Sequence, residues 1–374
     1  MTGWQLAMKN LWRRPARTLL TAIAVAIGIA AVVSLTAISW GFEASWQHAN
    51  DARGTDLIVT RASSENTMPA PFAAAALQAQ LAAMPHVSQV AGLLSEMLSV
   101  DDAPPLFVFG WERNSFLWDH LHLLKGRWPI DDSEHGVLLG ELAAELTGKH
   151  IGDSMHIESD DYQVIGIYQS SALVENGALL MTLKQAQRLN EMPGKVNVLN
   201  IKLDDPVTQI KLADIRAKVR ATMPGYVALT SGQLVQQNAV VRISKAMSGA
   251  TILIAGLVGA LGVFNTMLMS ISERTREIGV LLAVGWHRRR VIRLVLTESI
   301  IVTALGGLLG VLLGVFGVFL LEHVELLRGK IDGVITLPLV LAALGLAVLL
   351  GALGGLYPAL RASRLSPTVA LRYE

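Results

Sequence analysis

The 374-residue sequence contains no cysteine, and only 16% of its residues are charged and 6% aromatic. The missing cysteine excludes disulfide bonds and thiolate metal ligands. Because 52% of the residues are hydrophobic, so small a charged fraction is typical of a membrane protein rather than of an ordinary soluble one. The net charge of +1 gives no support to nucleic-acid binding. The composition therefore predicts a membrane protein with no nucleic-acid partner.

The middle of the chain, residues 41–243, has no apolar run long enough to cross a bilayer, for which about 20 residues are needed. Acidic residues outnumber basic ones there by 23 to 15. Strand-like and helix-like segments alternate, and a segment of this length can form its own core. We therefore predict an α+β domain. Its predicted strands are 56–60, 136–140, 155–157, 162–168 and 198–203, and its predicted helices are 71–84, 141–147 and 207–223.

Four apolar runs outside this domain are long enough to span a membrane. Basic residues lie beside their predicted cytoplasmic ends, so the positive-inside rule places both termini in the cytoplasm and the α+β domain outside. A cleaved signal peptide is the alternative for the first run, but its apolar core is too long and no cleavage site stands out. The resulting segments are an interfacial amphipathic helix 1–17, spans 18–40, 247–271, 295–321 and 337–358, a cytoplasmic loop 272–294, an outer loop 322–336 and a cytoplasmic tail 359–374.

The loop between the second and third spans carries a short predicted helix. Glu273 and Glu277 suit the positive end of a helix dipole, and Gly285 is a plausible stop. From pattern alone, two interpretations stay open: a solvated connector held on lipid headgroups, or a helix that docks on a soluble partner. Apolar residues recur at helical spacing and define one face of this helix, namely Ile278, Leu281, Leu282 and Gly285.

Glycines repeat every four residues in the third span, at Gly306, Gly310 and Gly314. Small residues on one helical stripe let two helix backbones approach closely. A seam with a second copy of the chain and internal packing are both open, with the seam slightly preferred. In the same span Glu298 is costly within hydrocarbon, and we expect it to pair with a basic residue such as Arg17 or Arg293.

No catalytic constellation is recognisable, and the chain lacks the phosphate-binding pattern G-x-x-x-x-G-K-[ST]. Gly148 and Lys149 are followed by His150 and do not have that spacing. His120 and His122 would face the same way on a strand and are the candidates for a metal or haem site, but they belong to no recognised metal-ligand spacing. We therefore predict no enzymatic activity, no metal and no cofactor in this chain.

Three segments together resemble one protein family. Residues 272–285 read SERTREIGVLLAVG and are similar to the cytoplasmic loop of MacB/FtsX-type (type VII) ABC transporter permeases. The tail YPALRASRLSPTVALRY (357–373) resembles that family's C-terminal signature, and NLWRRPARTLL (10–20) resembles its amphipathic entry helix. The layout is also similar, with one span, a large outer domain and three further spans.

The resemblance implies a permease subunit of an ABC transporter in the bacterial inner membrane. ATP and Mg²⁺ would be bound by a separate ATPase subunit, and a second copy or a sister permease would complete eight spans. Export of a hydrophobic or amphiphilic compound is the first expectation, with a periplasmic adaptor as a further partner. Lipoprotein extraction, or regulation of a cell-wall hydrolase or sensor, are the alternatives. The ATPase-coupling residues implied are Glu273, Arg274, Arg276, Glu277, Ile278, Gly279, Leu281, Leu282, Ala283 and Gly285.

Overall fold

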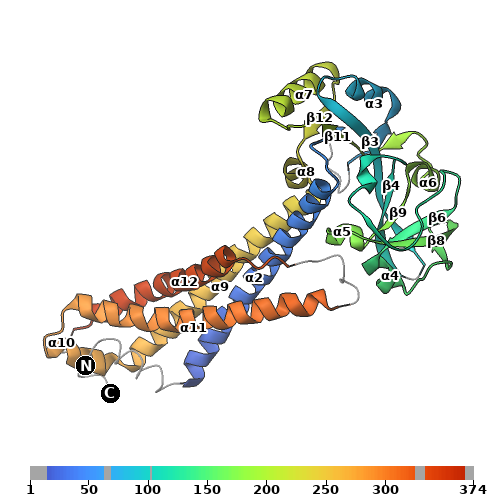
Figure 1. Ribbon diagram of the computed structural model, residues 1–374. Helices are drawn as coiled ribbons and strands as arrows, with labels where there is room; N and C mark the ends of the chain where they lie inside the picture. Colours follow the sequence, from blue (N-terminus) through green and yellow to red (C-terminus); the bar gives the residue numbers. More distant parts are fainter. Residues whose placement is uncertain (1–14, 63–68, 102, 325–332, 367–374) are drawn as a thin grey trace. The chain divides into compact units, whose positions relative to one another are not determined.

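The computed structural model describes residues 15–62, 69–101, 103–324 and 333–366 (Figure 1). The chain divides into a helical unit, Met1–Ser39 with Ser244–Leu320 and Gly333–Glu374, and an α+β unit, Trp40–Ile243 with Leu321–Asp332. The predictions for residues 1–14, for most of the outer loop and for the end of the tail lie outside the described residues.

In the described part of the chain, four helices are long and apolar enough to cross a membrane. They contain the four predicted spans and extend beyond them, and the first helix continues furthest, to Ala52 instead of residue 40. Since about 20 residues cover the hydrocarbon layer, the 38-residue α2 has turns to spare, and those from Trp40 onward belong to the α+β unit. The four helices are α2 (Pro15–Ala52), α9 (Ala239–Glu273), α11 (Arg288–Glu322) and α12 (Leu337–Ser363), and the short α10 (Thr275–Ala283) lies between α9 and α11.

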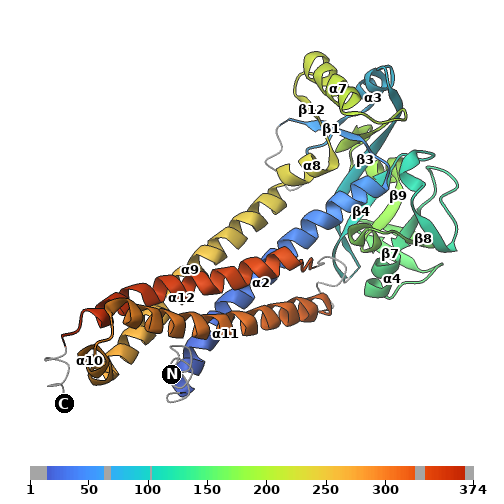
Figure 2. The same ribbon diagram turned by 60° about the vertical axis from the view of Figure 1, so that its left-hand side comes forward.

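The helical unit has an aliphatic core shared by all four long helices. Small residues allow these contacts, since glycines face a neighbouring backbone at several crossings. The Ser299 hydroxyl on α11 also donates a 2.6 Å hydrogen bond to the Gly351 carbonyl on α12. Figures 1 and 2 show α11 and α12 running alongside each other. Core members include Val25, Ile29 and Val33 of α2, Val263 and Met267 of α9, Val311 and Val318 of α11, and Ala343 and Ala347 of α12.

The glycine stripe of α11 is used for packing within the chain. A Cβ atom added to Gly306 would lie 2.7 Å from the Ala22 carbonyl oxygen, and one added to Gly310 would lie 2.7 Å from that of Ala26. A Cβ atom added to Gly314 would lie 2.8 Å from the Val33 Cβ. The preferred prediction of a seam with a second copy is therefore wrong for this stripe, because α2 already occupies it.

The α+β unit is built on a ten-stranded, mixed sheet. Its main strand order is β12-β1-β11-β3-β4-β9-β6-β8-β5, with β7 pairing with β3 and β8, and β2 and β10 form a separate pair. Most pairs are antiparallel, while β4 pairs with β9 and β6 with β8 in parallel. The strands are β1 (Leu57–Arg61), β2 (Phe72–Ala73), β3 (Val87–Val100), β4 (Ala103–Trp111), β5 (His122–Gly126), β6 (Gly136–Gly140), β7 (Ser154–Ile157), β8 (Asp160–Gln169), β9 (Leu179–Thr182), β10 (Lys195–Val196), β11 (Val198–Leu203) and β12 (Tyr226–Leu229).

Short helices cover this sheet and close three hydrophobic clusters. One cluster lies under α3 and α7, and a second lies under α4 and α6. The third is aromatic and includes Phe109 and Trp111, against which the partly buried Trp118 and Trp128 pack. The helices are α3 (Ala75–Ala82), the 3₁₀ turn η1 (Phe116–Trp118), α4 (Glu141–Thr147), α5 (Leu173–Asn176), α6 (Leu183–Leu189), α7 (Gln209–Thr222) and α8 (Ser231–Gln237).

The predicted strands and helices of this domain are found near their expected positions, with one correction. The helix expected over 71–84 begins only at Ala75, because Phe72 and Ala73 pair with β10 and the Phe72 ring is buried. The longest strand, β3, was missed. Its buried and exposed residues do not alternate along most of its length, so the period-2 signal of a strand is absent.

Candidate coupling site

The short helix α10 begins and ends close to its predicted limits. Arg274 is the N-cap residue and Glu277 lies in the first turn, where a carboxylate suits the helix dipole. Glu273 is instead the last residue of α9, so its predicted place in the first turn is wrong. Gly285 adopts a φ of +97°, a left-handed conformation that favours glycine, and the Trp286 amide donates to the Leu281 carbonyl at 3.0 Å.

One face of α10 packs on the rest of the helical unit. Ile278 is only 4% exposed, Gly279 is buried, and Leu282 is partly buried in the same cluster. This contact explains the predicted apolar face, because the aliphatic side chains of α10 are shared with the ends of three other helices. The cluster consists of Ile271 of α9, Ile278, Val291 and Val295 of α11, and Ala359 and Ala362 of α12, with Leu282 and Trp286 at its edge.

The opposite face of α10 is open in the described structure and is partly apolar. Val280 is 44% exposed and Val284 is 78% exposed. Arg276, Glu277 and Ala283 are exposed beside them. The residues that the sequence predicted as one coupling group therefore divide into an inner set that holds the helix in place and an outer set that a partner can reach.

Arg274 ties this helix to α11. Its Nη1 lies 3.3 and 3.2 Å from the two carboxylate oxygens of Glu298, and its Nε donates to Glu277 at 3.1 Å. Glu298 is 6% exposed and does pair with a basic residue, but that residue is Arg274 rather than the expected Arg17 or Arg293. Buried carboxylates need such partners because desolvation of an unpaired charge is costly.

The two candidate metal ligands do not come together in a metal site. His120 Nε2 lies 2.7 Å from Glu175 Oε2, whereas His122 is exposed at the start of β5. Among the described residues, no group of three or more histidine, cysteine or acidic side chains could hold a metal ion.

A buried ion pair at the end of α2 was not predicted from the sequence. Arg53 Nε donates to Glu175 Oε1 at 2.7 Å, and the two side chains are 3% and 0% exposed. Burial opposes ionisation of Glu175, but the nearby Arg53 charge and hydrogen bonds from His120 and Ser170 hold the pKa of that carboxyl below its ordinary value. No local pattern in the sequence links Arg53 to Glu175, which lies 122 positions along the chain.

The architecture defines a class of protein. Four apolar helices, an α+β domain inserted after the first and a short amphipathic helix between the second and third are the layout of a membrane transporter permease. A family model for the MacB-like periplasmic core domain matches residues 18–219, and one for the FtsX-like permease C-terminal region matches residues 249–367. The chain belongs to the MacB/FtsX-type family of ABC transporter permeases.

Two relatives are named as export proteins. The macrolide export ATP-binding/permease protein MacB of Nitrobacter winogradskyi is 31% identical over 389 residues, which cover 96% of this chain and 58% of the relative. The pyoverdine export ATP-binding/permease protein PvdT of Pseudomonas syringae pv. tomato is 27% identical over 408 residues, covering 99% and 59%. The chain thus spans somewhat less than two thirds of the length of these relatives.

One solved structure is similar to part of this chain. The periplasmic region of MacB from Actinobacillus actinomycetemcomitans is 14% identical, with a TM-score of 0.38, over 50% of this chain and 94% of that structure.

Proposed function

We propose that this chain is the permease subunit of an ABC exporter and that α10 is its coupling helix, which docks on a nucleotide-binding subunit. The observation that carries this proposal is the division of α10 into two faces. Val280 and Val284 are exposed together beside charged residues, and an apolar patch within a charged rim suits a protein partner.

The inner contacts of α10 provide a route for force. Because Ile278 is buried among residues of α9, α11 and α12, a push on α10 reaches three long helices at once. The Arg274–Glu298 ion pair adds a directional link to α11. Packed interiors transmit displacement because they are dense and deform little.

ATP and Mg²⁺ are bound, in this proposal, by a separate ATPase subunit. The 374-residue sequence has no phosphate-binding loop pattern. The relatives are named as ATP-binding/permease proteins and are longer than this chain, which supports an ATP-driven assembly. The membrane is the bacterial inner membrane, with α10 and both termini in the cytoplasm and the α+β domain in the periplasm, as the basic flanks of the spans favour.

The exported compound is proposed to be hydrophobic or amphiphilic, with a periplasmic adaptor as a further partner. The names of the relatives refer to macrolide and pyoverdine export and favour this choice over lipoprotein extraction or regulation of a cell-wall hydrolase.

A second permease copy is proposed to pack along α9. This helix is the least buried of the four long helices in the described structure, and a Cβ added to Gly249, Gly256 or Gly262 meets no atom within 4 Å. Leu253, Leu257 and Leu261 are exposed on the same helix. Because the natural sequence has no cysteine, a single Gly256→Cys variant should form a disulfide-linked dimer under mild oxidation.

The docking proposal is tested with the double variant Val280→Asp and Val284→Asp in the complex reconstituted with its ATPase subunit. We expect cargo-stimulated ATP hydrolysis to fall by about tenfold or more, since apolar anchors at the centre of an interface contribute about 2 kcal/mol or more. Ile210→Asp on α7 is the matched control, because Ile210 is 82% exposed and far along the chain from α10. Unchanged stimulation in the double variant would contradict the docking role.

A further inference from the structure

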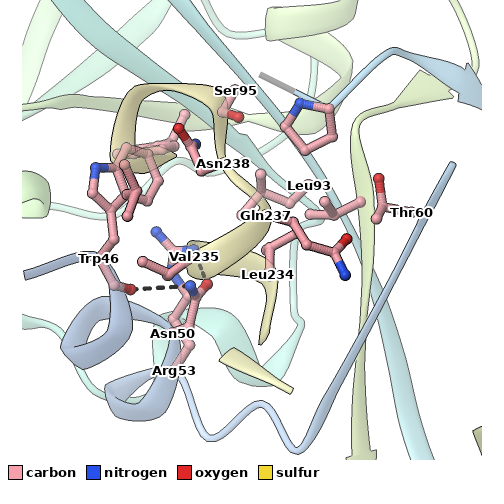
Figure 3. A pocket seen from close by; sticks show the side chains of 14 residues that line it. Trp46, Asn50, Arg53, Thr60, Leu93, Ser95, Leu234, Val235, Gln237 and Asn238 are labelled. Carbon is pink, nitrogen blue, oxygen red and sulfur yellow. Dashed lines mark hydrogen bonds between the residues drawn. The ribbon is translucent and has the colours of Figure 1, made fainter. Parts of the chain in front are cut away.

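A cavity of about 60 Å³ lies inside the α+β unit, where the last turns of α2 meet the connection between α8 and α9 (Figure 3). Trp46, Asn50 and Arg53 approach it from α2 and its C-terminal end. Leu234 and Asn238 approach it from the α8 side. Figure 3 shows these side chains arranged around an open centre, on the side of the sheet where α2 ends.

Arg53 brings an unsatisfied donor to this cavity. Phe109 and Trp111 lie over the guanidinium group, with ring centroids 5.3 and 5.1 Å from its central carbon. Nε is used by Glu175 at 2.7 Å and Nη1 by the Asn50 side-chain oxygen at 3.3 Å. Within the described residues Nη2 is buried and has no hydrogen-bond partner. A buried guanidinium N–H without an acceptor is costly, so an acceptor is expected in the cavity.

The charge of Arg53 is already balanced. Glu175 is buried, lies 2.7 Å from Arg53 Nε and also accepts hydrogen bonds from His120 and Ser170. Among the described residues that line the cavity, Arg53 is the only charged one. The other polar groups there are amides, hydroxyls and the Trp46 indole N–H, a second buried donor without a partner among the described residues. A second anion would therefore pay the cost of desolvation without an unpaired cation to offset it. An uncharged acceptor carries no such penalty.

The walls and the size limit what can enter. The apolar surfaces of the cavity are formed by Trp46, Phe109, Leu93 and Leu234. Its volume exceeds the roughly 10–15 Å³ that one water needs, and is well below the roughly 150 Å³ of a cavity that binds benzene. It therefore suits a group of a few atoms, or one end of a larger molecule.

We propose that this cavity is a binding site for an uncharged carbonyl group carried on a small apolar body, such as an amide, ester or ketone. The carbonyl oxygen accepts from Arg53 Nη2, and the attached carbon atoms contact Trp46 and Leu234. Because α2 and the α8–α9 connection both line the cavity, the bound group holds these two segments together. The binding step does not depend on the docking role of α10.

The test uses the full chain in lipid nanodiscs, labelled with 5-fluorotryptophan and followed by ¹⁹F NMR. The Trp46 resonance is assigned by its loss in Trp46→Phe. On titration with N-methylacetamide we expect a saturable shift of this resonance, while the other tryptophan resonances move little. Sodium acetate, a charged probe of similar size, should bind at least about tenfold more weakly because its charge must be desolvated.

Two variants separate binding from folding. Val235→Phe places a larger side chain in the cavity from α8 and leaves both members of the Arg53–Glu175 pair unchanged in sequence, and we expect it to abolish the saturable shift. Val207→Phe, at a half-exposed position that does not line the cavity, should keep it. A Trp46 resonance that shifts only linearly in the natural sequence would mean that the cavity holds water alone and would overturn the proposal. Tighter binding of acetate than of the amide would overturn the uncharged class of ligand.

Discussion

The Arg53–Glu175 pair shows how single residues fix the end of a long helix. Arg53 follows the last residue of α2, and Glu175 is on α5, 122 positions along the chain. Ser45 on α2 also accepts a hydrogen bond from the Val174 amide. Within the α+β unit, the last turns of α2 are thus held by an ion pair, a hydrogen bond and aromatic contacts.

Removing one partner of this pair should destabilise the α+β unit strongly. Arg53→Met leaves the Glu175 carboxylate buried without its main counter-charge, which typically costs about 3–5 kcal/mol. The measurement is urea unfolding of the full chain, followed by near-ultraviolet circular dichroism. Arg127→Met is the matched control: its pair with Glu134 is half-exposed, so a change of about 1 kcal/mol or less is expected there. Equal losses in the two variants would contradict the structural role of Arg53.

The same pair predicts a pH dependence. The folded-state pKa of Glu175 is lowered despite burial, mainly by Arg53. Its contribution to stability is therefore fully present above the unfolded carboxyl pKa of about 4.3 and is lost as the pH falls through the lower folded pKa. Unfolding midpoints measured between pH 7 and pH 3 should fall less steeply in Glu175→Gln than in the natural sequence. If the unfolding midpoints of the two proteins fall equally steeply as the pH is lowered, Glu175 does not titrate in this way.

At the scale of helices and strands, α11 is fitted to α2 by the absence of side chains at Gly306, Gly310 and Gly314. Gly310→Val should destabilise the helical unit by about 1–3 kcal/mol, because the new side chain overlaps Ile29 and the Ala26 carbonyl. Gly345→Val on α12 is the control, since a Cβ there meets no atom within 4 Å. Thermal unfolding in detergent distinguishes them. A Gly310 variant as stable as the Gly345 variant would contradict the packing.

The elements that sequence could predict are those with a strong local signal. Long apolar runs predict the four long helices, and Glu277 and Gly285 predict α10 to within a few residues of its limits. The strand β3 and the partner of Glu298 could not be predicted. The first lacks alternation, and the second depends on how the end of α9 turns into α10 and brings Arg274 to α11.

The two faces of α10 show that the candidate site, too, depends on tertiary packing that local sequence does not predict. Hydrophobic spacing predicted one helix side with Ile278, Leu281, Leu282 and Gly285. Of these, Ile278 is buried, Leu281 and Leu282 are partly buried, and Gly285 is exposed. Spacing alone does not say whether that side meets a partner or the chain itself. The neighbours that decide the question, on α11 and α12, are supplied by tertiary packing, which leaves Val280 and Val284 as the exposed apolar residues.

On the scale of the whole molecule, each unit packs a different set of elements. The helical unit gathers α9, α11 and α12 around α10, and the α+β unit holds the end of α2 in its aromatic cluster. Both α2 and α9 pass without a break from one unit into the other. In the proposed function, these continuous helices would give a movement at α10 a covalent route to the α+β domain.

The most direct test of this account is a cross-link between α10 and the ATPase subunit. A photoreactive amino acid at position 284 replaces the exposed Val284, and the complex is irradiated in inverted membrane vesicles with and without ATP. We expect a cross-link to the ATPase subunit whose yield changes with nucleotide, and none from the same probe at position 210. A probe at 284 that labels only lipid, or that is reached only from the opposite side of the membrane, would contradict the coupling role.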